Sequence, residues 1–269
     1  MKPVFLIGMT FVLCATNQAY PQENKKNGES YARLVSSLEE EDEVKRRRAA
    51  FALWEHGEKA VGPLIKALSD HDMDVRFAAS DSLSRIGHAA VEPLLQSISD
   101  SDHEEWVVRT LARMGKEAIP QLVDSLDQDD PCVQAAAARA IGKIGLEARQ
   151  AIPSLAKLLK ENETKVRRAA AFALARMEHF ARTIWPNLVE AMGDPDAGVR
   201  RNVSLGIAHV APIVEGSVPL IIPFLNDEEL EVRKNIAHAI ERIGPEAASV
   251  LVDAMVSGVF AGNVHELSL

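Results

Sequence analysis

Glu163–Glu178 reads E-T-K-V-R-R-A-A-A-F-A-L-A-R-M-E and decides how the rest of the chain is interpreted. It opens with an acidic turn, continues with Val166-Arg167, and then places small apolar residues such as Ala169 and Ala173 at helical spacing. Residues at this spacing fall on one side of a helix, so the stretch predicts a helix with a narrow, alanine-rich buried face. Such a stretch is typical of the inner helix of a repeated helix pair.

Three kinds of marker recur along the chain with a period of 33 residues. Apolar segments open at prolines 120, 153, 186 and 219, and two further prolines stand at 63 and 93. The other markers are a valine column and the residues that close each unit, namely Val133, Val166, Val199 and Val232, then Gly145, Glu178, Ala211 and Gly244. Three markers in one register over four units indicate a repeat architecture.

Each unit can be explained as a pair of helices. Proline is tolerated in a first helical turn because its missing N–H has no partner there. The apolar residues that follow predict a first helix of about ten residues. An acidic turn such as Asp194 to Asp196 can cap the second helix, and a final Ile144-Gly145 supplies a left-handed C-cap. One pair buries too little surface to be stable alone, so neighbouring pairs must stack.

The combined pattern of Pro-x-Leu, acidic turn, Val-Arg, Ala-Ala-x-Ala-Leu and Ile-Gly resembles HEAT repeats, in the short form also found in phycobilin lyase subunits (the PBS-lyase type). The resemblance implies an all-α fold, an α-α superhelix of about seven helix pairs and a terminal half repeat. The solenoid is expected to span residues 31–256, with an irregular tail at 257–269. The tetratricopeptide and ankyrin signatures, Trp-x-x-Leu-Gly and Thr-Pro-Leu-His, are absent.

The chain is acidic and poor in aromatic residues. Its 269 residues carry a net charge of −9, and 47% are hydrophobic but only 5% aromatic. A core of small aliphatic side chains suits closely packed helices. A net negative charge repels the phosphate backbone. Composition therefore favours an all-α protein and argues against general nucleic-acid binding.

Residues 1–19 have the composition of a secretory signal peptide. Lys2 precedes an apolar run from Val4 to Ala15, which is too short to span a bilayer, and cleavage is expected after Ala19 or Ala15. Residues 20–30 are polar and predict a disordered linker. The mature protein is therefore expected to be exported, to the periplasm or outside the cell, without a membrane span.

Neither of the two cysteines is predicted to carry a lipid anchor or to form an internal disulfide. Leu13 stands where a bacterial lipobox needs a small residue, which argues against a lipid anchor at Cys14. Removing the signal leaves Cys132 alone, so no internal disulfide is expected.

Arginine follows valine shortly after the acidic turn in several units, at Arg76, Arg167, Arg200 and Arg233. The resemblance to HEAT repeats implies that each pairs with an aspartate of its own or the adjacent unit. A partly buried arginine needs such a partner. These four residues are predicted to form a structural ladder.

Other basic residues stand beside the ladder and are candidates for binding a partner: Arg46, Arg47, Arg48, Arg168, Arg201 and Lys234. A further basic column comes two residues before the unit ends, where cations complement the helix dipole, at Arg85, Arg113, Lys143, Arg176 and Arg242. If both columns emerge on one face, they form a groove for an acidic peptide or another polyanion.

Patterns that carry chemistry are sparse. The stretch Asp100–Trp106 holds acids and a histidine without metal-ligand spacing. Deoxyhypusine hydroxylase, an iron enzyme of HEAT-like repeats, has His-Glu directly after Val-Arg, but the His positions here hold Phe77, Glu105, Ala135, Arg168, Arg201 and Lys234. Cys132 stands at a helix start without a nearby histidine. No catalytic, cofactor-binding or metal-binding residue is predicted.

The favoured interpretation is an exported, non-catalytic scaffold that binds a protein or peptide on a concave face lined by second helices. Two alternatives stay open. One is a lyase-like or metal-dependent enzyme subunit on a HEAT-like scaffold, against which the export signal argues. The other is an accessory fragment of a larger exported repeat protein, suggested by the incomplete last unit, which is either a cap or a truncation.

Overall fold

The structure is a computed structural model that describes residues 30–100 and 103–256. Every regular element in these two ranges is a helix, which confirms the all-α prediction. The predicted signal peptide and nearly all of the linker, and the predicted tail, lie outside the described residues. Tyr31 begins a compact unit of its own, and this unit holds every helix of the described residues.

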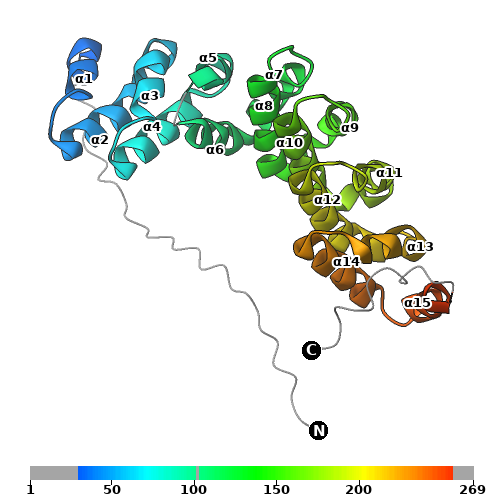
Figure 1. Ribbon diagram of the computed structural model, residues 1–269. Coiled ribbons are helices and arrows are strands. Elements are labelled where there is room, and N and C mark those ends of the chain that lie inside the picture. Colours follow the sequence, from blue (N-terminus) through cyan, green and yellow to red (C-terminus); the bar gives the residue numbers. More distant parts are fainter. Residues whose placement is uncertain (1–29, 101–102, 257–269) are drawn as a thin grey trace, which may run out of the picture. The chain divides into compact units, whose positions relative to one another are not determined.

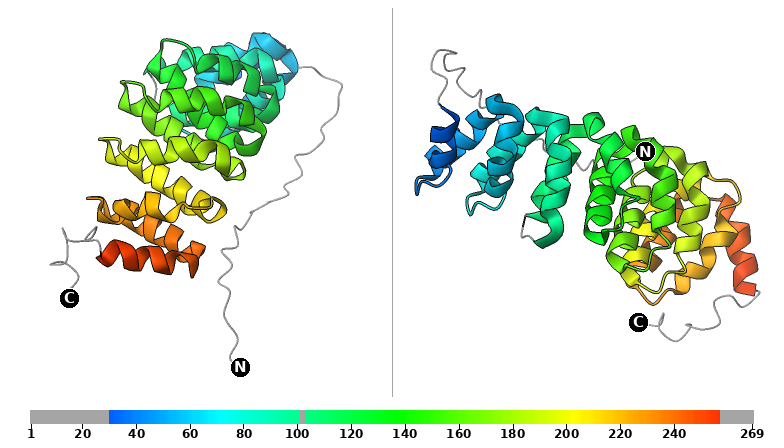
Figure 2. Two further views of the ribbon diagram at one scale, coloured as in Figure 1. Left: turned by 90° about the vertical axis from the view of Figure 1, so that its right-hand side faces the viewer. Right: turned by 90° about the horizontal axis from the view of Figure 1, so that it is seen from above.

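The helices of this unit alternate between two layers (Figures 1 and 2). The first helices are α1 (Tyr31–Ser37), α3 (Val61–Ala67), α5 (Val91–Gln96), α7 (Ile119–Ser125), α9 (Ile152–Leu158), α11 (Ala181–Ala191) and α13 (Val218–Ile221). The second helices are α2 (Glu43–Ala52), α4 (Met73–Ile86), α6 (Glu104–Met114), α8 (Pro131–Ile144), α10 (Thr164–Ala175), α12 (Ala197–Val210) and α14 (Leu230–Ile243). After them comes α15 (Glu246–Val256), the predicted half repeat.

Short 3-10 segments connect or extend these helices: η1 (Leu53–Ala60), η2 (Gly87–Ala90), η3 (Ser97–Asp100), η4 (Gly115–Glu117), η5 (Gly145–Ala151), η6 (Glu178–Phe180), η7 (Ala211–Ile213) and η8 (Ile222–Asn226). They make most first helices shorter than the ten residues expected, as in α9, which has seven. Pro153 stands in the first turn of α9, so the residues before it adopt 3-10 geometry instead of extending the helix.

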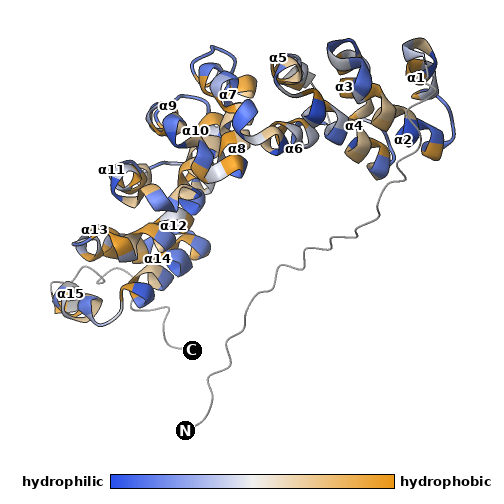
Figure 3. Ribbon diagram, turned by 180° about the vertical axis from the view of Figure 1, so that it is seen from behind, coloured by the Kyte–Doolittle hydropathy of each residue, from blue (hydrophilic) through white to orange (hydrophobic). Residues whose placement is uncertain are grey.

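Neighbouring second helices pack against one another. Those from α2 to α12 also pack against the first helix of their own pair, while α14 packs against η8. The valine column lies in this interface, with Val75, Val166, Val199 and Val232 fully buried. Small residues bring the axes close, since a Cβ added at Gly142 would lie 2.8 Å from the Cα of Ala173. The hydrophilic residues gather in the turns that join the helices (Figure 3).

Aspartates begin several second helices as predicted. The carboxylates of Asp42, Asp72, Asp130 and Asp196 accept hydrogen bonds from backbone N–H groups of the first turn. Glu163 and Glu229 take the same position without a side-chain capping bond. The acidic turns therefore cap the helix only where the acid is aspartate.

Glycine ends four of the second helices, α4, α6, α8 and α14, at positive φ, but not in the left-handed helical conformation expected. Gly87, Gly145 and Gly244 have φ of 72°, 76° and 80° with ψ of −138°, −128° and −146°. That combination lies in a region that only glycine adopts readily. The chain thereby turns sharply from a second helix into the next 3-10 segment.

No helix among the residues described is both long and apolar enough to cross a membrane.

Candidate functional site

Arginines of the ladder link one unit to the next at several junctions. Arg167 Nε lies 2.7 Å from Asp194 Oδ2, while its Nη1 donates to the carbonyls of Glu161 and Asn162. Arg200 repeats this arrangement 33 residues later, with Asp227 at 2.8 Å. Each guanidinium thus donates hydrogen bonds to the turn of its own unit and forms an ion pair with a carboxylate of the following unit.

Arg46 belongs to this ladder and not to the partner-binding candidates. Its side chain is buried, with the residue only 4% exposed. Nε lies 2.8 Å from Asp70 Oδ2, and Nη1 donates to the carbonyls of Glu40 and Glu41. Because these internal partners hold the guanidinium below the surface, Arg46 is removed from the candidate set.

The other two predicted ladder residues also secure their own turns. Arg76 donates to the carbonyl of Asp70 and lies over the ring of Trp106. Arg233 donates to the carbonyls of Asp227 and Glu228. Gln134 takes the ladder position in α8 and donates to the carbonyl of Leu126.

Three remaining candidates reach forward to an acid at the start of the next second helix. Arg47 pairs with Asp74 at 3.2 Å, Arg168 with Asp196 at 2.7 Å and Arg201 with Glu229 at 3.4 Å. Lys234 instead pairs with Glu231 of its own helix, and Arg48 is exposed. Arg168 is typical of the set, since its side chain is 54% exposed although it is paired.

The Arg168–Asp196 pair has the strongest electrostatic signature. The hydrogen bond from the Arg168 guanidinium, together with backbone N–H donors of Val199 and Gly198, lowers the pKa of Asp196 to about 2. The same bond raises the pKa of Arg168. Asp196 also caps α12, so one carboxylate serves both the helix start and the surface pair.

We use the name second-helix face for the positions that stand ten, six and two residues before each unit end, from Gly57 to Gly244. They follow one another at intervals of four residues and so share one side of each second helix. Eleven of these positions are basic: Arg47, Arg85, Arg109, Arg113, Arg139, Lys143, Arg168, Arg176, Arg201, Lys234 and Arg242. Three are acidic: Glu55, Asp81 and Glu105. In the unit from Tyr31 the second helices lie on the inner side of the curve (Figure 1).

Contacts between units connect these positions into one surface. Arg85 of α4 and Arg113 of α6 both pair with Asp81, Arg85 through Nε at 2.9 Å. Arg85 also lies over Phe51 of α2, and Arg113 over Phe77 of α4. The basic column at the unit ends and the positions beside the ladder therefore emerge on the same face.

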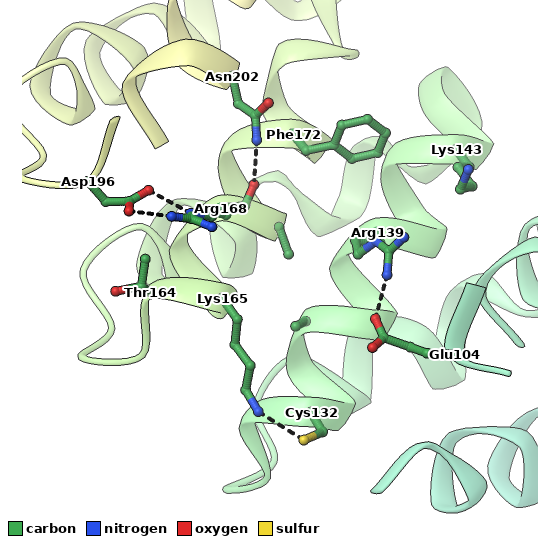
Figure 4. Close-up of a pocket in the computed structure, with 12 residues that line it drawn as sticks. Glu104, Cys132, Arg139, Lys143, Thr164, Lys165, Arg168, Phe172, Asp196 and Asn202 are labelled. Atoms are coloured by element: carbon green, nitrogen blue, oxygen red, sulfur yellow. Dashed lines mark hydrogen bonds and ion pairs between the residues drawn. The ribbon is translucent and has the colours of Figure 1, made fainter. Parts of the chain in front are cut away.

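Part of this face forms an open groove of about 790 Å³ bordered by α6, α8, α10 and α12. We call it the basic groove. Its charged lining residues are Arg139, Lys143, Lys165 and Arg168 against Glu104 and Asp196. Figure 4 shows the Arg139–Glu104 and Arg168–Asp196 pairs on either side, with Lys165 reaching Cys132 below.

Lys165 and Cys132 lie together at the helix starts of α10 and α8. Lys165 Nζ is 2.9 Å from Cys132 Sγ, and this hydrogen bond raises the pKa of the lysine. A catalytic amine is activated by the opposite shift, because only the neutral form is a nucleophile. Lys165 is therefore a fixed positive charge at the edge of the groove.

A smaller hollow of about 270 Å³ continues from the basic groove toward α12. The two share Phe172 and Asn202 as lining residues. We call this hollow the apolar extension, since Phe172, Ala175 and Leu205 form its apolar part, beside Arg176, Glu178 and His209. Asn202 fixes the boundary by donating to the Arg168 carbonyl at 3.0 Å.

Within residues 30–100 and 103–256 no three side chains of His, Cys, Asp or Glu are grouped so that they could hold a metal ion. Part of the acidic stretch Asp100–Trp106 lies outside these ranges. His103 is buried, with Nδ1 2.9 Å from Ser69 Oγ.

Comparison with known proteins matches the repeats of this chain to a family model and to solved structures. A family model described as HEAT repeats matches residues 31–114, 91–175 and 185–260. Two crystal structures of engineered proteins, both Northeast Structural Genomics Consortium targets, are similar. The first is 22% identical, with 79% of this chain and 96% of that chain covered and a TM-score of 0.45. The second is 26% identical, with 87% and 73% covered and a TM-score of 0.48.

A third similar structure is the complex of CpcE and CpcF of phycocyanin lyase from Nostoc sp. PCC7120. It is 24% identical, with 55% of this chain and 98% of that chain covered and a TM-score of 0.41. A search of curated proteins finds no match. The family match extends over most of the chain, from the first helix pair to the last, and the chain belongs to the HEAT-repeat family.

Proposed function

We propose that this protein is an exported, non-catalytic scaffold whose second-helix face binds an acidic segment of a partner protein. The observation that carries the proposal is the distribution of charge. The chain as a whole has a net charge of −9, yet its second-helix face holds eleven basic residues against three acidic ones. Five more acids pair with this face from the helix starts, namely Asp74, Glu104, Asp196, Glu229 and Glu231, and the basic residues still exceed them.

The internal ion pairs on this face do not prevent binding. Exposed pairs contribute only about 0–1 kcal/mol each to stability. A carboxylate of the partner can therefore replace an internal one at little cost, or share a guanidinium that has unused N–H groups. The pairs also hold the cations in place before the partner arrives, which reduces the entropy lost on binding.

A scaffold role without catalysis is supported by the direction of the Lys165 pKa and by the structural use of the ladder arginines. Export is supported by the apolar run of residues 4–15 after Lys2. N-terminal sequencing of the mature protein tests export, with a start at Tyr20 or Thr16 expected. A start at Met1 in a protein that stays inside the cell contradicts it.

Binding of fluorescent polyglutamate to the mature protein tests the function. Lys143→Gln with Lys165→Gln removes two charges from the basic groove and should weaken binding about threefold to tenfold. Lys66→Gln with Lys157→Gln is the matched control, because these exposed lysines lie on first helices α3 and α9. Affinity should fall as salt rises, since the charges are exposed.

Equal binding by the wild type and the groove variant would contradict the proposal. So would an equal loss in the control variant, because binding would then depend on total charge and not on the second-helix face.

A further inference from the structure

We infer that the partner segment carries a large apolar side chain close to its acidic residues, and that this side chain binds in the apolar extension between α10 and α12. The inference rests on the proposed function and adds to it the kind of sequence that the face selects. It rests on two observations: the two hollows adjoin, and an exposed leucine, Leu205, lines the second of them.

The two hollows adjoin on the second-helix face. Phe172 and Asn202 line both of them and form the boundary between the cationic part and the apolar part. A segment that places carboxylates near Arg139 and Arg168 must continue either toward α12 or toward α6. On the α12 side it meets Phe172, Ala175 and Leu205.

Leu205 is exposed without a packing reason. Its residue is 49% exposed, although Val203 and Ile207 on the same helix are fully buried. Four of the six equivalent positions in other units are charged or polar, as at Asp81, Arg139 and His238, and two hold Phe51 and Phe172. Leu205 and Phe172 line the same hollow, so together they offer apolar surface to a ligand.

Polar side chains border this apolar surface, and one of them covers part of Phe172. Arg176 lies over the ring of Phe172, with its Cζ 5.5 Å from the ring centroid, and its Nε donates to the Gly142 carbonyl at 2.9 Å. The guanidinium is thus held on α8 and α10. The space beside Leu205 is bordered by Glu178 and His209, which lie 3.6 Å apart.

Helix spacing sets the separation expected in the partner. Packed helices lie about 8–10 Å apart, so Leu205 on α12 is about 10 Å from the column of Arg168 and about 20 Å from that of Arg139. An extended segment rises about 3.3 Å per residue. Acidic residues about three and about six residues from the apolar one therefore fit the path.

A pure polyanion uses only part of this surface. Nucleic acids and sulfated sugars have no aliphatic side chain for the extension, and Glu178 adds a negative charge beside it. A protein segment with both acidic and apolar residues matches the basic groove and the apolar extension. Its carboxylates pair with the cations of the groove, and its apolar side chain is buried in the extension.

Two fluorescein-labelled peptides test the inference on the mature wild-type protein. Both are about twelve residues long and rich in Glu and Ser, and one has a single Leu about three residues from the nearest Glu where the other has Ser. Fluorescence anisotropy should give an affinity about tenfold higher for the Leu peptide, as expected for burial of one leucine side chain. Leu205→Ser should abolish that difference and leave the binding of the Ser peptide unchanged.

Leu220→Ser is the matched control, since Leu220 is 48% exposed but lies on first helix α13. It should keep the tenfold preference, and circular dichroism should show both variants folded. Equal binding of the two peptides by the wild type would overturn the inference, while loss of both in the Lys143→Gln, Lys165→Gln variant would leave the proposed function standing. Failure of both peptides and of polyglutamate to bind would instead overturn the proposed function. Tighter binding of heparin or single-stranded DNA than of the Leu peptide at equal charge would also overturn the inference.

Discussion

Arg200 and Asp227 form an ion pair across the boundary between two units, with Nε 2.8 Å from Oδ2 and both side chains less than a tenth exposed. Removing Asp227 leaves the buried Arg200 guanidinium with only the exposed carboxylate of Glu228 as a charged partner. Asp227→Ala is therefore expected to lower the free energy of unfolding by about 3 kcal/mol. Denaturation by urea, followed by circular dichroism, measures the change.

The adjacent Arg201 supplies the comparison, because its pair with Glu229 is exposed. Arg201→Met should cost less than about 1 kcal/mol. If both substitutions destabilised the protein equally, the ladder would have no special structural role.

Glycines at different positions should respond differently to alanine. Gly145 has φ of 76° with open space around it, so Gly145→Ala adds backbone strain alone and should cost about 1–3 kcal/mol. Gly62, in α3, also has open space but no positive φ, and Gly62→Ala should be neutral or stabilising by up to about 1 kcal/mol. Melting temperatures of the two variants decide the point, and equal values would contradict the role of positive φ.

Stability should fall in acid partly through Asp196. Its pKa in the folded protein is about 2, below the ordinary value of 3.8, so the carboxylate stabilises the fold above about pH 4. This contribution is lost as the pH falls from about 4 to about 2. Asp196→Asn should lower the melting temperature at pH 7 and reduce its further loss between pH 4 and pH 2. Parallel pH profiles for the variant and the wild type would refute this assignment.

Under the proposed function, Glu104 competes with an acidic ligand for Arg139. Glu104→Gln should free the Nη1 side of the guanidinium, while Nη2 stays paired with Glu105. It also removes one negative charge from the groove, so the affinity for polyglutamate should rise severalfold. Glu147→Gln is the control, since Glu104 and Glu147 both have side chains 46% exposed and Glu147 pairs with Lys116 outside the groove. A lower affinity in Glu104→Gln would argue that Glu104 helps to hold the ligand.

The repeat register could be predicted because the same contacts recur in each unit. Valine, arginine and the closing glycine each satisfy one fixed requirement, namely burial between helices, a partner for the turn and a positive φ. First-helix length could not be predicted in the same way. Apolar spacing does not distinguish an α-helix from the 3-10 segment that precedes the proline.

Arg46 shows where the sequence pattern was misleading. It stands in a run of three arginines without the usual valine before it, so the ladder residue was not evident. The decisive signal is its distance from the cap, since Arg46 follows the N-cap Asp42 by four residues, as Arg200 follows Asp196. Counting from the capping aspartate would have separated it from Arg47 and Arg48.

Arg139 and Lys165 were missed for a different reason. Arg139 stands away from the repeat markers, whereas Lys165 directly precedes Val166 of the valine column, and each becomes part of the groove only because α8 and α10 lie side by side. The signal for Arg139 was the interval of four residues that connects Ala135, Arg139 and Lys143 along one helix side.

The two-sided bonding of the ladder arginines also determines how the chain can change length. Arg167 and Arg200 each donate to two carbonyls of the turn before them and to an aspartate of the unit after them, and Arg200 also donates to Glu228. The junctions on either side of a unit are therefore interchangeable. Deleting residues 167–199 would join Val166 to Arg200. Arg200 would then donate to the carbonyls of Glu161 and Asn162, in the place of Arg167, and would keep its ion pair with Asp227. A whole repeat can thus be copied or lost without leaving a buried charge unpaired. The number of units, and with it the length of the second-helix face, is therefore open to gradual adjustment by duplication.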